Sequence, residues 1–241
     1  MSKIKDVIEG RKATKSPATS GRQKLMDAAL ELAGTTKSLA SLGLREVARQ
    51  AGLNPNTFYR HFKDFDELGV AMLDELGAKL RKGLRERRLM PAAKGLRLSN
   101  TDNPTEVLRE AQSIIRESIG LVLDFATEHE ASYVVGIREL HGTSPVLRKA
   151  LRNLLDGIAQ DMAEDVLGVL ELPMVRRETV EEISLVVIRQ MTFFSMDYLE
   201  NPEQRDQIKL RAERFILLLF WGAIAEEAPQ LVADVKFTFP K

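Results

Sequence analysis

Apolar residues recur every three or four positions along most of this chain, which is the period of an amphipathic α-helix. The pattern predicts helices over 20–33, 44–51, 55–62, 65–88, 105–128, 131–139, 145–170, 177–199 and 203–227. Strand-like alternation occurs only near the C-terminal end, over 232–239, and we assign it no role. The sequence therefore predicts an all-α fold.

The segment 44–63, LREVARQAGLNPNTFYRHFK, predicts two short helices that cross at a tight turn. Gly52 can adopt the left-handed conformation that ends a helix, and Asn54 followed by Pro55 can start the next one. Small Ala48 lets the second helix cross closely above the first. This pattern favours a helix-turn-helix whose second helix enters the DNA major groove, and the alternative is a hairpin that only packs.

The charge distribution favours the DNA-binding interpretation. The formal net charge is +0, but residues 1–63 hold 12 Lys/Arg and 5 Asp/Glu, whereas residues 64–241 hold 23 and 30. A basic head gains affinity for the phosphate backbone through counterion release, and an acidic body avoids non-specific binding. We therefore expect double-stranded DNA as a partner.

Side chains of this segment are the candidate DNA contacts, and they are Arg45, Asn54, Asn56, Thr57, Tyr59, Arg60, His61 and Lys63. Asn56 suits adenine, Arg60 suits guanine, and Thr57 suits a base or a phosphate. Tyr59, His61 and Lys63 are better placed for phosphates, with a core-edge position as the alternative for His61.

Composition argues against an enzyme. The chain has no cysteine, and its histidines, His61, His129 and His141, match no metal-binding spacing. A phosphate loop, a nucleophile elbow and a dinucleotide fingerprint are also missing, so we expect no catalysis and no cofactor. No leader-like apolar segment or run of about eighteen apolar residues occurs, which predicts a cytoplasmic protein without membrane contact, on the nucleoid when DNA-bound.

The last two predicted helices carry more apolar surface than one face needs. Helix-turn-helix proteins usually read palindromic sites as twofold dimers, so we expect a homodimer through these helices. The candidate dimerisation residues are Val187, Met191, Tyr198, Phe215, Leu218 and Trp221. The alternative is that these helices are simply buried within one chain.

The body also offers a candidate lining for a hydrophobic ligand. Its residues are Ile115, Ile119, Val122, Phe125, Val134, Ile137, Arg138, Leu154, Ile158, Met191 and Phe194. Few charged groups interrupt this set, which suits an aliphatic molecule. An apolar stripe is more often core than pocket, and that alternative stays open.

The predicted recognition helix, with Thr57, Tyr59, His61 and Phe62, resembles that of the TetR family of bacterial one-component regulators. The helix predicted over 20–33 is similar to the family's first helix, and the one from residue 65 to 80 is similar to its fourth. The resemblance implies an N-terminal three-helix DNA-binding domain, a C-terminal ligand-binding and dimerisation domain, and a four-helix bundle across the dimer axis.

Two positions depart from the family pattern. Phe65 stands where members usually carry a lysine, and Lys63 can supply that phosphate contact instead. Gly43 stands where a serine or threonine cap is expected before the first helix of the motif, which leaves Glu46 to complete a weakened capping box.

A second segment, RELHGTSPVLRKAL at 138–151, makes the resemblance narrower. Through Arg138, Glu139, Gly142, Thr143 and Ser144 it is similar to TetR-type repressors of unsaturated fatty acid synthesis. This resemblance implies long-chain acyl-CoA or acyl carrier protein thioesters as the signal and desaturation or fatty acid synthesis genes as targets. Arg138 would meet a coenzyme A phosphate, or else form a buried ion pair with Glu139 or another acid.

We therefore expect a basic arm at 1–19, a helix-turn-helix domain at 20–66, a helical ligand-binding and dimerisation domain at 67–228, and a tail at 229–241. The arm is expected to be disordered, with minor-groove contact as the alternative. Rival functions are a TetR-type regulator of an efflux or catabolic operon and, in another class, an acyl-binding carrier without a DNA role. The basic residues between 81 and 88 fit a solvated helix face better than direct DNA contact, and they are a second candidate for the coenzyme A phosphate.

Overall fold

The computed structural model describes residues 20–35, 38–93, 104–168 and 175–229, and every regular element within them is a helix. The α-helices are α1 (Gly21–Thr35), α2 (Leu44–Gln50), α3 (Pro55–Phe58), α4 (Phe65–Ala93), α5 (Pro104–Glu128), α6 (Glu130–Arg138), α7 (Pro145–Gly168), α8 (Arg177–Glu200) and α9 (Arg205–Glu227). Two 3₁₀ helices, η1 (Leu39–Ser41) and η3 (Pro202–Gln204), complete the set. The all-α prediction is confirmed for these residues, while the arm at 1–19 and the strand-like tail lie outside them.

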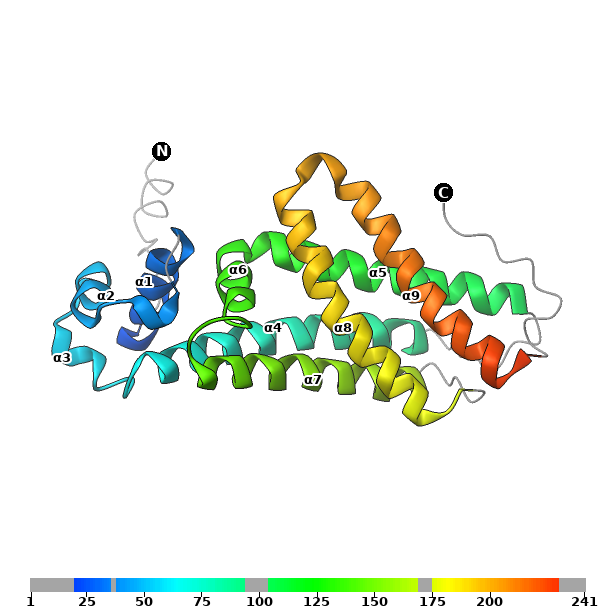
Figure 1. The fold of residues 1–241 in the computed structure, drawn as a ribbon, viewed down its shortest axis with the longest axis horizontal. Helices are drawn as coiled ribbons and strands as arrows, with labels where there is room; N and C mark the ends of the chain where they lie inside the picture. The colour runs from blue at the N-terminus through cyan, green and yellow to red at the C-terminus, as the bar shows by residue number, and fades with distance from the viewer. Residues whose placement is uncertain (1–19, 36–37, 94–103, 169–174, 230–241) are drawn as a thin grey trace, which may run out of the picture.

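The helices form a head at one end of an elongated body (Figure 1). Helices α1 to α3 make the head, and α4 runs from the head along the body beside α7. Helix α8 packs on α7, and α9 packs on α5 and α8. Helix α4 therefore belongs to both parts, because its start meets the head and its remainder is a body helix.

The second helix of the motif differs from its prediction, because regular α-helix ends at Phe58 rather than near Phe62. Beyond Phe58 the chain makes two shorter-range bonds, from the N–H of Arg60 to the carbonyl of Thr57 at 3.2 Å and from the N–H of His61 to the carbonyl of Phe58 at 2.9 Å, before the N–H of Phe62 bonds the carbonyl of Phe58 at 2.9 Å. Such i→i+3 bonds tighten the last turn of a helix. The polar residues 59–61 are thus presented by a tight turn.

Close packing joins α4 to α7. A Cβ atom added to Gly69 would lie 2.7 Å from Cδ2 of Leu147, and one added to Gly77 would touch the end of the Leu154 side chain. Each leucine therefore fills the space that a side chain on α4 would need.

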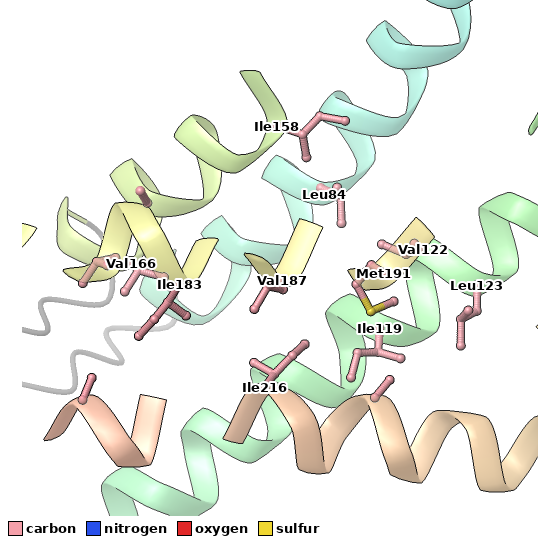
Figure 2. Close-up of a cluster of buried hydrophobic side chains, with 14 of the residues drawn as sticks. Leu84, Ile119, Val122, Leu123, Ile158, Val166, Ile183, Val187, Met191 and Ile216 are labelled. Carbon is pink, nitrogen blue, oxygen red and sulfur yellow. The ribbon is translucent and has the colours of Figure 1, made fainter. Parts of the chain in front are cut away.

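The body has one continuous apolar core, which we call the body cluster (Figure 2). Its labelled members in that view are Leu84, Ile119, Val122, Leu123, Ile158, Val166, Ile183, Val187, Met191 and Ile216. They come from α4, α5, α7, α8 and α9, so the core ties together every long body helix.

A second core, the head cluster, is built mainly from α1 to α4 and includes Leu25, Ala29, Phe58, Phe62 and Leu68. It also includes Val135 of α6 and Leu147 of α7, which are 3% and 0% exposed. The predicted boundary at residue 66 therefore does not separate two independent cores, because body helices complete the core of the head.

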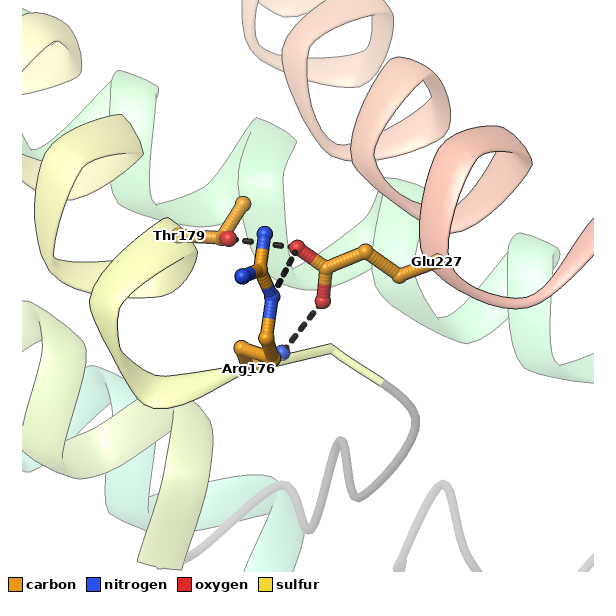
Figure 3. A network of polar contacts seen from close by, with 3 residues as sticks. All are labelled: Arg176, Thr179 and Glu227. Atoms are coloured by element: carbon orange, nitrogen blue, oxygen red, sulfur yellow. Dashed lines mark hydrogen bonds and ion pairs between the residues drawn. The ribbon is translucent and has the colours of Figure 1, made fainter.

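At the far end of the body, a polar network closes α9 onto the start of α8 (Figure 3). The side chain of Glu227 accepts hydrogen bonds from the backbone N–H of Arg176 at 2.5 Å, from Nε of Arg176 at 3.1 Å and from the hydroxyl of Thr179 at 2.5 Å. These bonds satisfy an amide at the N-terminus of α8, where a helix leaves its first N–H groups without intrahelical partners. They lower the pKa of Glu227, with the Thr179 hydroxyl as the largest cause and the Arg176 N–H next. None of the described helices combines the length and the low polarity needed to cross a membrane.

Candidate nucleic-acid interface and effector region

The turn of the helix-turn-helix is built as the sequence predicts. Gly52 has φ 66°, in the left-handed region. The N–H of Leu53 reaches back to the carbonyl of Ala48 at 2.9 Å, which completes a helix-ending turn that favours glycine. The partly buried Leu53 then packs against the head cluster.

The start of α3 is also confirmed. Oδ1 of Asn54 accepts a hydrogen bond from the N–H of Asn56 at 2.9 Å, and Pro55 occupies the first helical position. At the start of α2, by contrast, Gly43 provides no side-chain cap, as its lack of a side chain predicts. The residue before the second helix of the motif therefore caps it with a side chain, whereas the residue before the first has no side chain to do so.

Aromatic packing fixes which face of α3 points outward. Phe58 is 0% exposed, and its ring centroid lies 5.9 Å from that of Phe62 and 5.2 Å from that of Phe65. Phe65, which departs from the family pattern, thus contributes to the aromatic core of the head. The opposite face of α3 is left to the polar residues.

Six of the eight candidate DNA contacts are exposed, and these are Arg45, Asn54, Asn56, Tyr59, Arg60 and Lys63. Tyr59 is 66% exposed, which is a large open aromatic surface next to a buried phenylalanine. Thr57 and His61 are partly buried. An exposed surface of amide, hydroxyl and basic groups offers the donors and acceptors needed for base edges and phosphates.

His61 lies closest to the core of these residues. A Cβ atom added to Gly21, at the start of α1, would lie 2.8 Å from Nε2 of His61, so the imidazole packs against that backbone. This placement matches the core-edge alternative. Because His61 is only partly buried, the exposed part of its ring is the part that could contact a phosphate.

The start of α4 carries a reciprocal cap that the sequence reasoning missed. The N–H of Glu67 donates to Oδ1 of Asp64 at 2.9 Å, and the N–H of Lys63 donates to Oε2 of Glu67 at 2.6 Å. The Asp-x-x-Glu spacing at 64–67 is the signal that could have predicted it. The cap fixes the backbone at Lys63, whose side chain remains exposed.

The basic residues on α4 make contacts within the body. Arg81 donates two hydrogen bonds to Asp161 of α7 at 2.7 and 2.8 Å, and its pKa is raised chiefly by that bonding. Lys82 lies 3.9 Å from Glu86. These contacts fit a structural and solvated helix face. The side chains of Arg87 and Arg88 lie outside the described residues.

Most of the candidate ligand residues belong to the body cluster. Ile119, Val122, Ile158 and Met191 are buried members, and Ile115, Leu154 and Phe194 pack against it. Phe125, Val134 and Ile137 are partly buried, and the ring centroid of Phe125 lies 4.5 Å from that of His129. Most of this set is therefore core, which matches the alternative that the sequence left open.

Arg138 contacts the head. Its Nη1 donates to the carbonyl of Ala33, near the end of α1, at 3.3 Å. The described residues show no ion pair between Arg138 and Glu139. Glu139 instead accepts a hydrogen bond from the N–H of Leu39 at 3.1 Å.

Two surface hollows lie within the described part of the chain. One lies between α1, α4 and α6, lined in part by Met26, Leu30, Leu73 and His129. The other, of about 440 Å³, lies between α7 and α8. Neither is lined by a candidate ligand residue, and the described residues contain no group of three or more acidic or histidine side chains placed to hold a metal ion.

The candidate dimerisation residues divide by exposure. Val187, Met191 and Tyr198 are 2%, 6% and 6% exposed and belong to the body cluster of their own chain. Leu218 is 46% exposed, while Phe215 and Trp221 are partly buried.

Helix α8 instead exposes Val186 and Phe193, at 48% and 60%. Val186 precedes the buried Val187, and Phe193 precedes the partly buried Phe194. Because α8 is apolar nearly all round, its sequence does not show which side faces outward. We call Val186, Phe193, Leu218 and Trp221 the outer face.

Comparison with known proteins finds a family match for the head. Residues 25–72, which run from α1 into α4, match the family of bacterial regulatory proteins described as the tetR family. The match covers the whole helix-turn-helix and the cap that leads into α4.

Solved structures extend the likeness over most of the chain. A TetR-family transcriptional regulator from Syntrophomonas wolfei is 14% identical, with a TM-score of 0.64 over 83% of this chain and 95% of that one. The fatty acid degradation regulator FadR from Bacillus halodurans is 13% identical, with a TM-score of 0.61 over 87% and 98%. The multidrug binding protein EbrR, in complex with imidazole, is 17% identical, with a TM-score of 0.56 over 83% and 94%.

Identities this low show a common fold and leave the ligand open, since one fold serves many ligands. The head matches the family model, the described body shares the fold of these structures, and the motif at 44–63 lies within the matched residues.

Proposed function

We propose that this protein is a ligand-responsive, sequence-specific transcriptional repressor that acts as a homodimer on a palindromic operator. The observation that carries the proposal is the head, where a capped α3 presents an exposed polar surface above a buried Phe58. On the body, Arg81 is paired with Asp161, which favours a structural role for this arginine over DNA contact. DNA contact is therefore assigned to Arg45, Asn56, Thr57, Tyr59, Arg60, His61 and Lys63, whereas Asn54 caps α3.

Dimerisation is assigned to the outer face. Its exposed apolar side chains lie on α8 and α9, the helices that the family resemblance places across the dimer axis. Two heads related by a twofold axis can read major grooves about 34 Å apart, which matches a palindromic site. A second copy would cover side chains such as Phe193 that one chain leaves in water.

The proposed ligand is a long-chain acyl-CoA or acyl carrier protein thioester, and the proposed targets are genes of unsaturated fatty acid synthesis or desaturation. The body core is aliphatic, which suits an acyl chain that would enter by parting residues such as Ile119 and Met191. A protein of the same fold regulates fatty acid degradation, which makes this ligand class compatible with the fold.

The proposed mechanism is a population shift. A ligand changes operator affinity only if it binds the DNA-competent and incompetent arrangements of the dimer unequally. Helix α4 is the mechanical link, because Leu68 packs in the head cluster and Leu84 packs in the body cluster. A tilt of α4 therefore changes the separation of the two recognition surfaces.

The test is to measure binding of the purified protein to its own upstream intergenic DNA and to desaturase and fatty acid synthesis promoters, with and without palmitoyl-CoA and oleoyl-CoA. We expect specific binding that at least one thioester shifts. Raising the salt from roughly 50 to 200 mM should weaken binding on the order of a thousandfold if about six phosphates are contacted.

The other outcomes separate the rival functions. Specific DNA binding that ignores both thioesters would discard the acyl ligand and favour an efflux or catabolic operon, in line with the fold shared with a multidrug binding protein. Thioester binding without specific DNA binding would instead favour an acyl carrier.

A further inference from the structure

The turn between α6 and α7 is fastened to the head. We call residues 138–144 the junction turn. Arg138 donates to the carbonyl of Ala33, Glu139 accepts from the N–H of Leu39, and the hydroxyl of Ser144 donates to Oδ1 of Asp66 at 2.7 Å. These three bonds reach the end of α1, the η1 helix and the first turn of α4.

Glu139 is the central member of the junction turn. It is 1% exposed, although it carries a carboxyl group. One oxygen accepts the bond from Leu39 at 3.1 Å, and the other has no hydrogen-bond partner among the described residues. Burying a carboxyl group with so few partners costs stability, and a buried apolar residue of similar volume often stabilises a fold more. Stability therefore does not explain why a carboxyl group occupies this place.

The bond made by Glu139 fixes the entrance to the DNA-binding motif. Leu39 is 2% exposed and belongs to η1, the short helix between α1 and α2. Its N–H is at the N-terminus of η1, where no intrahelical partner exists. Because η1 leads directly into α2, holding Leu39 holds the motif at a set angle to α6.

Gly142 completes the arrangement. A Cβ atom added there would overlap Oε2 of Glu139 and lie 3.1 Å from its Cδ atom and 3.2 Å from its Cα atom. The carbonyl of Gly142 also accepts a 2.5 Å hydrogen bond from Nη1 of Arg148, which fixes this part of the turn to α7. The absence of a side chain at Gly142 therefore leaves room for the Glu139 carboxyl group.

We propose that Glu139 is a positioning residue for DNA recognition. Through Leu39 it sets the orientation of the head on the body, and so sets the half-site spacing that the dimer prefers. This inference rests on the proposed function as a dimeric DNA reader. It goes beyond that function because it assigns the junction turn to the control of spacing, whereas the sequence resemblance assigned Arg138 to the ligand.

The experiment measures spacing preference directly. Wild-type protein first selects its preferred palindrome from a randomised DNA library, and affinities are then measured for that palindrome with its half-sites moved one base pair closer or farther apart. The ratio of two affinities does not depend on the fraction of active protein, so partial unfolding of a variant does not distort it.

Glu139→Leu fills the same space but cannot accept the Leu39 bond, so we expect the ratio to fall on the order of tenfold. Glu139→Gln keeps an oxygen for that bond and should restore the ratio to within about twofold of wild type. A spacing ratio that is kept in Glu139→Gln and lost in Glu139→Leu would show that the hydrogen bond to Leu39 matters, and not only the volume of the side chain.

Glu213→Leu is the matched control. Glu213 is also a buried carboxyl, 3% exposed, but its partner is Arg116, and it joins α5 to α9 within the body. Its loss should lower the melting temperature and leave the spacing ratio unchanged.

Gly142→Ala provides a second, independent route. Its Cβ displaces the Glu139 carboxyl group, so the spacing ratio should fall as in Glu139→Leu. Glu139→Ala removes the carboxyl group that this Cβ atom would displace. Adding Gly142→Ala to Glu139→Ala should therefore have little further effect on the spacing ratio.

Two results would overturn the inference. A spacing ratio unchanged in both Glu139→Leu and Gly142→Ala, with the wild type selecting a palindrome, would remove Glu139 from head positioning and leave the regulator intact. A wild type that selects no DNA sequence would overturn the proposed function and this inference together.

Discussion

Two asparagines, two residues apart, have different tasks at the tip of the head. Asn54 uses its side-chain oxygen to cap α3, whereas the exposed Asn56 offers its amide to whatever lies outside. A base-reading side chain must be free to pair with a base edge, and a capping side chain is already committed to the backbone. The two positions can therefore be separated by experiment.

Asn56→Ala should reduce the preference for the correct base at one operator position by about 1–3 kcal/mol. Its melting temperature should stay close to that of the wild type, because the side chain is exposed. Asn54→Ala should show the reverse pattern and lose about 1 kcal/mol of stability while keeping its base preference.

Selection from a randomised library with each variant, together with thermal unfolding, measures both effects. Unchanged base preference in Asn56→Ala would remove that residue from base reading. A stable Asn54→Ala would show that the cap contributes little.

At the scale of elements, the contact between α4 and α7 depends on glycine. Gly77→Ala places a Cβ atom against Leu154, so we expect a loss of about 1–3 kcal/mol from overpacking. Gly120→Ala on α5 is the matched control, since nothing lies within 4 Å of the added Cβ atom. That change should stabilise the helix by about 0.5–1 kcal/mol.

Chemical denaturation of both variants tests this pair. Equal free energies of unfolding in the two variants would contradict close packing at Gly77.

The closure of α9 onto α8 should depend on pH. The partners of Glu227 lower its pKa below the ordinary value of 4.5, so its contribution to stability is complete above that value. The contribution is lost as the pH falls through the depressed pKa of the folded state. Glu227→Gln should therefore destabilise the protein at pH 7, and the difference from wild type should shrink as the pH is lowered below about 4.5.

Unfolding free energies of wild type and Glu227→Gln across this range provide the measurement. Glu226→Gln, at the exposed neighbouring carboxyl, is the control. A difference that stays constant down to the lowest pH would contradict the role of the ionised Glu227 network.

The sequence predicts the helices well because apolar periodicity marks their length and local residue preferences mark their ends. Gly52, Asn54 and Pro55 define the motif through backbone preferences that need no tertiary contact. The outward side of α8 could not be predicted in this way, since Val186 and Val187 are equally apolar and only packing separates them. The position of Arg138 at the head was also beyond sequence, because its partner Ala33 is 105 residues away.

At the scale of the whole molecule, the outer face should decide the oligomeric state. Val186 and Val146 are both 48% exposed, but Val186 belongs to the outer face and Val146 lies at the start of α7. Val186→Glu places a charge in the proposed interface, and an unpaired buried charge weakens association by several kcal/mol. Val146→Glu should leave the assembly unchanged.

Analytical ultracentrifugation of the two variants over a range of concentrations gives the dissociation constants. We expect Val186→Glu to become monomeric at concentrations where Val146→Glu and wild type remain dimeric. Because the monomer has one recognition surface, its operator affinity should also fall. Equal dissociation constants for both variants would place the dimer interface elsewhere.

The close packing of Leu147 and Leu154 against the glycines of α4 limits how α4 can move relative to α7. Gly69 and Gly77 are eight residues apart, and the leucines that occupy them, Leu147 and Leu154, are seven apart. Sliding α4 along α7 by less than a helical turn, about 5.4 Å, would push both leucines against larger neighbouring side chains. This packing therefore favours rotation of the two helices together over sliding of one along the other. Under the proposed function, an effector that loosened the core without rotating α4 and α7 would bind and leave operator affinity unchanged.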